Sequence, residues 1–138
     1  MRDVEVPMTD DTEPWPPITF KVLTASGKFV GYGSDNGLGA YEVYLPGGDD
    51  EGFMGVVLGS NVEFSSGVEA GSVKGTTIKY SDGSLAGTID GEMIYDECRR
   101  VVAATAGTAS VEARGGAVLL LIFNRWFLPD GSPNPEVR

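Results

Sequence analysis

The chain has 138 residues, enough for one domain with a core of its own, and it contains 20 glycines. Twenty acidic against ten basic residues give a net charge of −10, which argues against a nucleic acid or an anionic membrane as partner. There is no histidine and a single cysteine, which excludes Ser-His-Asp and Cys-His catalysis, histidine-bound metals and an intrachain disulfide. We therefore predict a protein that uses neither a metal nor another cofactor.

Residues 1–17 are acidic and rich in proline, and they predict a flexible arm, because such a segment buries too little apolar surface to offset its ordering entropy. The segment has no apolar targeting signal, so we expect a cytoplasmic protein. Trp15 is the exception in this arm. Prolines on both sides stiffen it into an extended conformation, and we expect it to dock over one mouth of the domain or into a neighbouring subunit.

The segments between the two ends of the chain are typical of short strands separated by Gly, Ser, Asp and Pro turns. No helical period is visible, and no helix longer than two turns is expected. The run AVLLLIF is too short to cross a bilayer and suits a buried strand. Eight strands are predicted, at 18–25, 28–33, 40–45, 53–64, 72–80, 84–96, 99–104 and 116–127.

Glycines inside these strands favour a closed barrel over a flat sandwich, because closing a small sheet needs sharp bends. The fold class predicted is therefore all-β, an eight-stranded antiparallel barrel over residues 18–128, with a flexible arm at 1–17 and a tail at 129–138. A small-residue turn around Thr105 and Gly107 and a bend at Gly115-Gly116 are expected before the last strand. In that turn, Gly107 should hold a backbone conformation that a side chain disfavours.

The stretch VVAATAGTASVEARGG, residues 101–116, resembles a turn of the allene oxide cyclase-like barrel superfamily, V-x-G-G-T-G-x-[FY]-x-x-A-x-G. Thr105, Gly107 and the Ala113-Gly115 step match, whereas Ala103-Ala104 replaces a glycine pair and Val111 an aromatic residue. About 55 residues share the likeness, which is closest to small bacterial polyketide cyclases of the spirotetronate type. The resemblance implies an eight-stranded barrel with a ligand cavity, often a homodimer or trimer, and it carries over no catalytic residue.

Candidate site residues come from the strands of the predicted barrel. Asn61 and Glu63 share one face of their strand, and an inward Glu63 beside an amide donor would act as a proton acceptor; a solvated face is the alternative. Glu92 is a second carboxylate with the same two interpretations. Tyr80 is the third catalytic candidate, because a tyrosine hydroxyl can bind a carbonyl, although tyrosines also pack structurally. The substrate-binding candidates are Tyr41, Tyr44, Asn61, Tyr95, Trp126 and Trp15.

The resemblance, together with the absence of histidine and of metal or nucleotide motifs, implies a cofactor-independent cyclase of natural-product biosynthesis, which would close a ring in an apolar, polyketide-like substrate by orienting it in a dry cavity. We expect a small-molecule partner and a homodimer. Two alternatives stay open: a non-enzymatic all-β structural module of the virion decoration type, and a carrier of an apolar small molecule. The state of the barrel interior distinguishes the module from the cyclase, because an open cavity favours ligand chemistry and a filled interior favours the module. The sequence does not separate the carrier from the cyclase.

Overall fold

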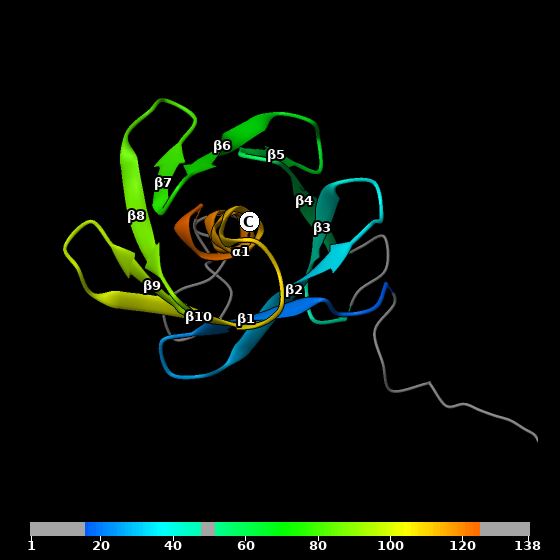
Figure 1. Ribbon diagram of the computed structural model, residues 1–138, viewed down its shortest axis with the longest axis horizontal. Coiled ribbons are helices and arrows are strands. Elements are labelled where there is room, and N and C mark those ends of the chain that lie inside the picture. Colours follow the sequence, from blue (N-terminus) through cyan, green and yellow to red (C-terminus); the bar gives the residue numbers. More distant parts are fainter. Residues whose placement is uncertain (1–15, 48–51, 125–138) are drawn as a thin grey trace, which may run out of the picture.

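The protein is described by a computed structural model over residues 16–47 and 52–124. Over these residues the chain forms a closed barrel of ten antiparallel strands, in which each strand pairs with the next and β10 closes on β1 (Figure 1). The predicted all-β barrel is confirmed. The strands are β1 (Phe20–Thr24), β2 (Phe29–Asp35), β3 (Ala40–Tyr44), β4 (Phe53–Leu58), β5 (Asn61–Phe64), β6 (Glu69–Lys74), β7 (Thr77–Tyr80), β8 (Leu85–Asp90), β9 (Met93–Asp96) and β10 (Val101–Gly107).

The predicted number of eight strands is wrong, because three runs interpreted as single strands are hairpins. Residues 53–64 and 84–96 each contain two short strands joined by a two-residue loop, and 72–80 contains the end of β6, such a loop and β7. Each loop begins with a glycine at a φ of 61° to 64°, namely Gly59, Gly75 and Gly91. A glycine at the first central position is the signature of the type II′ hairpin turn, whose twist matches that of the flanking strands. What looked like bends inside long strands are chain reversals.

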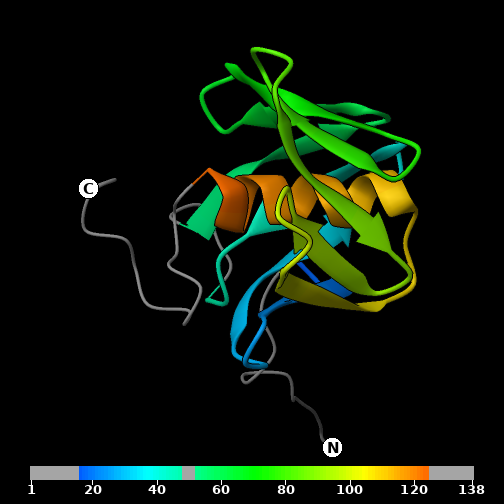
Figure 2. The same ribbon diagram turned by 90° about the vertical axis from the view of Figure 1, so that its left-hand side faces the viewer.

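The predicted last strand is also wrong. Its residues 116–123 lie in α1 (Val111–Val118) and in the π-helical turn η3 (Leu119–Phe123) that continues it, and its residues 125–127 lie outside the described part of the chain. Figure 1 shows α1 inside the ring of strands, and Figure 2 shows the helical run crossing the barrel. With eight residues in α1 and five in η3, this helical run also overturns the expectation of no helix longer than two turns. None of the helices in the described part of the chain is long and apolar enough to span a membrane.

A helix is the conformation that this position allows. Because β10 pairs with β1, the barrel leaves no edge to which a further strand could add. A segment inside the barrel must therefore satisfy its own backbone N–H and C=O groups, and a helix does so. Ser110 caps the start, its side chain accepting a hydrogen bond from the Ala113 N–H, and Asn124 closes the end, its Nδ2 donating to the Leu119 carbonyl at 2.7 Å.

Four of the five buried residues of α1 are alanine or glycine, and the barrel wall around them supplies the bulky side chains. A Cβ atom at Gly116 would lie 2.6 Å from Val57 Cγ2, and one at Gly115 would lie 3.1 Å from Val73 Cγ1. Each helical glycine costs about 1 kcal/mol of helix propensity. Here that cost is offset, because only a bare backbone lets the helix approach the valines this closely. The predicted bend at Gly115-Gly116 is thus a packing surface.

The second half reverses this arrangement, with bulky helical side chains against bare strand backbone. Four strand glycines each face one helical side chain, so that a Cβ atom added to the glycine would lie within 2.5 to 3.0 Å of it. The pairs are Gly31 with Leu121, Gly55 with Leu120, Gly71 with Leu119 and Gly87 with Phe123. The glycines inside the strands therefore make room for the helix, and the two halves fit together as complementary surfaces.

These glycines follow a period of sixteen residues. Gly55, Gly71 and Gly87 face the helix, and Gly59, Gly75 and Gly91 form the turns, each set spaced by sixteen. β4, β6 and β8 also share nearly the same pattern of burial, with an exposed residue last. Three consecutive hairpins are thus repeats of one unit, and this spacing was the signal that would have separated the strands correctly.

The connection into the helix confirms one prediction and corrects another. Gly107, the last residue of β10, has a φ of 133°, and a Cβ atom there would lie 2.6 Å from the Thr19 carbonyl oxygen. It holds a conformation that a side chain disfavours, as predicted. Thr105, expected in the turn, instead lies buried within β10. The connection to the helix is therefore shorter than expected.

Candidate functional site

The interior of the barrel is occupied by the chain's own helix. Leu119, Leu120 and Leu121 are each 0 % exposed and belong to one core cluster with Val57, Val62 and other inward residues of the wall. Upstream, Ala113, Ala117 and Val118 are also buried in that cluster. The space in which an eight-stranded barrel was expected to hold a ligand is filled here by apolar side chains of the same chain.

Three of the predicted tyrosines lie near the end of the barrel where η3 finishes. The Tyr80 hydroxyl donates a hydrogen bond to the Phe123 carbonyl at 3.2 Å, which ties β7 to the end of the helix. Tyr44 stacks on Tyr32, with ring centroids 5.5 Å apart, and its hydroxyl donates to Glu42. Tyr95 pairs with Thr88 of β8. The three side chains do not line one common cavity, because Tyr44 is on β3, Tyr80 on β7 and Tyr95 on β9.

The other predicted polar residues are distributed over the outer wall and the opposite end. Asn61 opens β5 and is exposed, and Glu63 follows on the same face, opposite to the fully buried Val62. Glu92 is exposed in the turn between β8 and β9. Tyr41 packs its ring edge against Phe20, with centroids 6.0 Å apart. The structure thus does not bring Asn61, Glu63 and Glu92 together with Tyr80, and Trp15 and Trp126 lie outside the described residues.

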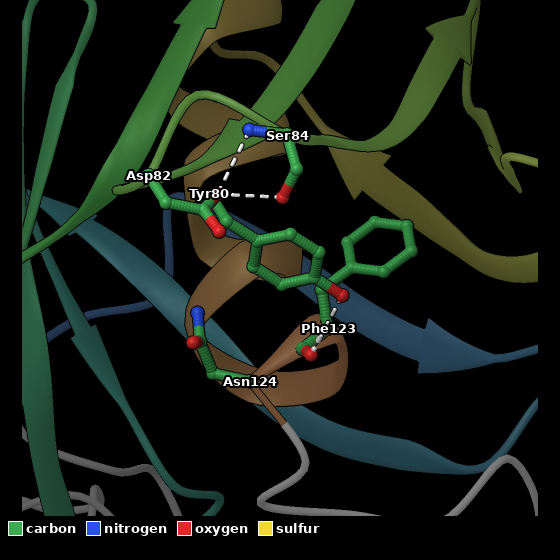
Figure 3. A pocket seen from close by; sticks show the side chains of 5 residues that line it. All are labelled: Tyr80, Asp82, Ser84, Phe123 and Asn124. Atoms are coloured by element: carbon green, nitrogen blue, oxygen red, sulfur yellow. Dashed lines mark hydrogen bonds between the residues drawn. The ribbon is translucent and has the colours of Figure 1, made fainter.

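A hollow of about 310 Å³ lies at the end of the barrel beside Tyr80 (Figure 3). It combines aromatic and polar groups, with lining residues Tyr80, Asp82, Ser84, Phe123 and Asn124. Figure 3 shows the Tyr80 and Phe123 rings side by side beneath the loop that carries Asp82 and Ser84. The Ser84 hydroxyl and N–H both donate to Asp82 Oδ1, at 2.6 and 2.8 Å. These bonds hold the pKa of Asp82 below its usual range, so the hollow carries a fixed negative charge.

A second hollow, of about 250 Å³, lies on β8 and β9 and is lined by Thr88, Asp90, Tyr95 and Arg99. Arg99 has a φ of 69°. In the turn between β9 and β10 it takes the position that Gly67 holds between β5 and β6 and Gly83 holds between β7 and β8. Asp96 organises this turn by accepting from the N–H groups of Cys98 and Arg100 and from Arg100 Nε. The hydrogen bond from the Arg100 backbone is the main cause that lowers the pKa of Asp96. The carboxylate here stabilises a turn and belongs to a structural network.

Sequence reasoning missed the residue that fastens the helix. Arg114 donates from Nη1 to the Gly91 carbonyl at 2.7 Å and to Thr105 Oγ1 at 3.3 Å, and from Nε to the Ala109 carbonyl. One guanidinium therefore joins α1 to β10 and to the turn between β8 and β9. A single arginine in this segment gives no signal of such a contact, because only the fold brings the Gly91 carbonyl and the Thr105 hydroxyl close to it.

The expected likeness to the allene oxide cyclase-like barrels rests on the residues of the turn at 101–116. Its implied open cavity differs from the arrangement described above, in which η3 and α1 occupy the barrel. Compared with protein-family models, with curated proteins and with solved structures, the chain matches none of them.

Proposed function

We propose that this protein is a non-catalytic, all-β structural module of the decoration type, which acts by binding a larger protein assembly. The observation that supports this proposal is the helix inside the barrel. It leaves the interior without room for a substrate and joins ten strands around one core in the described part of the chain. A barrel filled in this way is suited to a rigid body that presents its outer surface.

The energy needed to open the interior supports the same proposal. Burying a leucine side chain contributes roughly 2 kcal/mol, so exposing Leu119, Leu120 and Leu121 would cost about 6 kcal/mol. A ligand that displaced them would lose a factor of about 10⁴ in apparent affinity before any loss of hydrogen bonds from Arg114. An apolar carrier or cyclase that used the interior would work against this penalty.

Native mass spectrometry of the full chain with apolar, polyketide-like compounds tests the proposal. We expect no adduct, and amide hydrogen exchange across 111–123 should stay as slow with the compounds as without them. The matched control is Leu120→Ala, which shortens one interior side chain and makes room for a small apolar molecule. A one-to-one adduct of the unaltered chain, with faster exchange in the helix, would contradict the module.

A second candidate is the cofactor-independent cyclisation of an apolar substrate, now at the hollow beside Tyr80 instead of in the interior. The mixed aromatic and polar lining of that hollow favours it, because the Phe123 ring offers an apolar surface and Tyr80 a hydroxyl. The hydroxyl would bind a developing oxyanion after exchanging its present bond to the Phe123 carbonyl. A homodimer is part of this proposal, since a partner subunit would cover the hollow.

For the cyclase candidate, Tyr80→Phe should lower turnover of a polyketide-like substrate about 10²-fold, because it removes the donor and keeps the ring. Glu63 lies on the outer wall and Glu92 in a turn away from this hollow, so replacing either by Gln should leave turnover there unchanged. A loss of about 10²–10⁴-fold in either variant would place proton transfer outside the hollow. Glu69→Gln, at an exposed position of β6, serves as the control. Product formation followed by mass spectrometry decides, and full turnover in Tyr80→Phe would exclude this candidate.

A further inference from the structure

Three aromatic rings form a row across β2, β3 and β4. Tyr32 pairs with Tyr44, and Tyr44 pairs with Phe53 on the next strand. The Tyr32 and Tyr44 rings stack at 5.5 Å with 19° between their planes, and the Tyr44 and Phe53 rings are 5.4 Å apart. We call Tyr32, Tyr44 and Phe53 the aromatic row. Its members belong neither to the core cluster nor to the side chains packed against it.

The aromatic row lies on the outer face of the barrel. Gly31 faces Leu121 of the helix and Gly33 faces the Phe20 ring, so Tyr32, between them, points away from the interior. Val43 is in the core, which turns Tyr44 outward as well. Yet Tyr32 is 0 % exposed and Tyr44 only 8 %. An outward ring in a barrel wall keeps part of its surface exposed unless another segment covers it, and the described helices lie inside.

We propose that Trp15 and the N-terminal arm that carries it cover the aromatic row, so that the arm is a strap along the outside of the barrel. The row offers flat aromatic surface, and a tryptophan between prolines is a stiff, apolar side chain that loses little entropy on packing there. This proposal is independent of the proposed function, because it concerns a different face of the molecule.

The course of the chain favours the arm over the C-terminal residues. Thr19, where the arm meets β1, is bound to β2: its N–H donates to the Gly33 carbonyl and its hydroxyl accepts from the Asp35 N–H. Ser34, outward like Tyr32, is only 4 % exposed, so a buried track leads from the arm to the row. Trp15 stands four residues before Thr19 and reaches about 14 Å, whereas Tyr32 lies about 10 Å along β2 from Asp35.

A positive charge on β1, beside the aromatic row, also favours the N-terminal arm as the segment that covers the row. Residues 1–15 contain five acidic residues and one arginine, and the exposed Lys21 of β1 pairs directly with Tyr32. The Lys21 ammonium lies 5.5 Å from the centre of the Phe29 ring and stays at the surface, beside the edge of the row. A strap that passes over Ser34 runs beside Glu42, which pairs with Ser34, and meets the Lys21 cation at Tyr32. The attraction between the acidic strap and Lys21 should weaken with added salt.

Fluorescence of the full chain in a Trp126→Phe background, where Trp15 is the single tryptophan, tests the strap. We expect a blue-shifted emission with weak acrylamide quenching that does not change on dilution. Tyr44→Ala should shift the emission to the red and increase quenching several-fold, and the milder Phe53→Ser should act in the same direction. Tyr95→Ala, on β9, is the matched control and should change nothing, with circular dichroism verifying that each variant folds.

Three outcomes would overturn the strap. One is a Trp15 emission maximum typical of a fully water-exposed tryptophan when the aromatic row is unaltered. Another is a blue shift that disappears on dilution, which would assign the row to a second copy of the chain. The third comes from the reverse background, Trp15→Phe: if Trp126 emission responds to Tyr44→Ala there and Trp15 emission does not respond in its own background, the C-terminal segment is the occupant.

Discussion

Replacing Gly71 by alanine should lower the free energy of unfolding by about 3 kcal/mol, because the added methyl group has nowhere to go. Its Cβ would collide with the Lys79 carbonyl oxygen on β7 and lie 2.7 Å from Leu119 Cδ2. The carbonyl is part of a closed ladder of strands, and the leucine is fixed in the core, so neither can retreat freely. Urea unfolding followed by circular dichroism measures the effect.

Gly75→Ala, in the turn that follows Gly71 on the same hairpin, is the matched control. Gly75 has a φ of 61°, and a Cβ atom there would meet nothing within 4 Å. The change should cost only the strain of a left-handed alanine, about 1 kcal/mol. If Gly71→Ala were no more destabilising than Gly75→Ala, the close fit between the strand glycines and the helix would be contradicted.

Shortening Leu120 to alanine should lower the free energy of unfolding by about 3–4 kcal/mol. The side chain is 0 % exposed and rests on the bare backbone of Gly55, so its removal leaves a cavity between η3 and β4. The wall cannot collapse into that space, since it is held by hydrogen bonds to β3 and β5. Thermal or urea unfolding of the full chain provides the measurement.

The control for this substitution is Leu38→Ala in the loop between β2 and β3, where the side chain is 88 % exposed. We expect a change of less than about 0.5 kcal/mol there, because little apolar surface is buried. Equal effects at the two leucines would mean that the helix does not fill the interior in solution, and the case for the structural module would fall with it.

The sequence by itself determined the class of fold. Alternating β-branched and aromatic residues between turn signals predicted antiparallel strands, and the glycines within them favoured closure into a barrel, which the structure confirms. These are local properties, since a turn such as Ser81-Asp82-Gly83 forms from its own hydrogen bonds. The strand count failed at Gly59, Gly75 and Gly91, because a single glycine can mark a bend or a full reversal. The sixteen-residue repeat would have resolved this ambiguity.

Only the tertiary structure decided what the last apolar segment becomes. Residues 111–123 contain two adjacent glycines, which disfavour a helix, followed by an apolar run that is equally typical of a buried strand. The closed ladder offers that run no edge, whereas the strand glycines offer it a channel, so the helix forms because the barrel surrounds it. The same event separates the predicted site residues and fills the expected cavity. No local pattern encodes this, because it depends on contacts between residues as distant as Gly31 and Leu121.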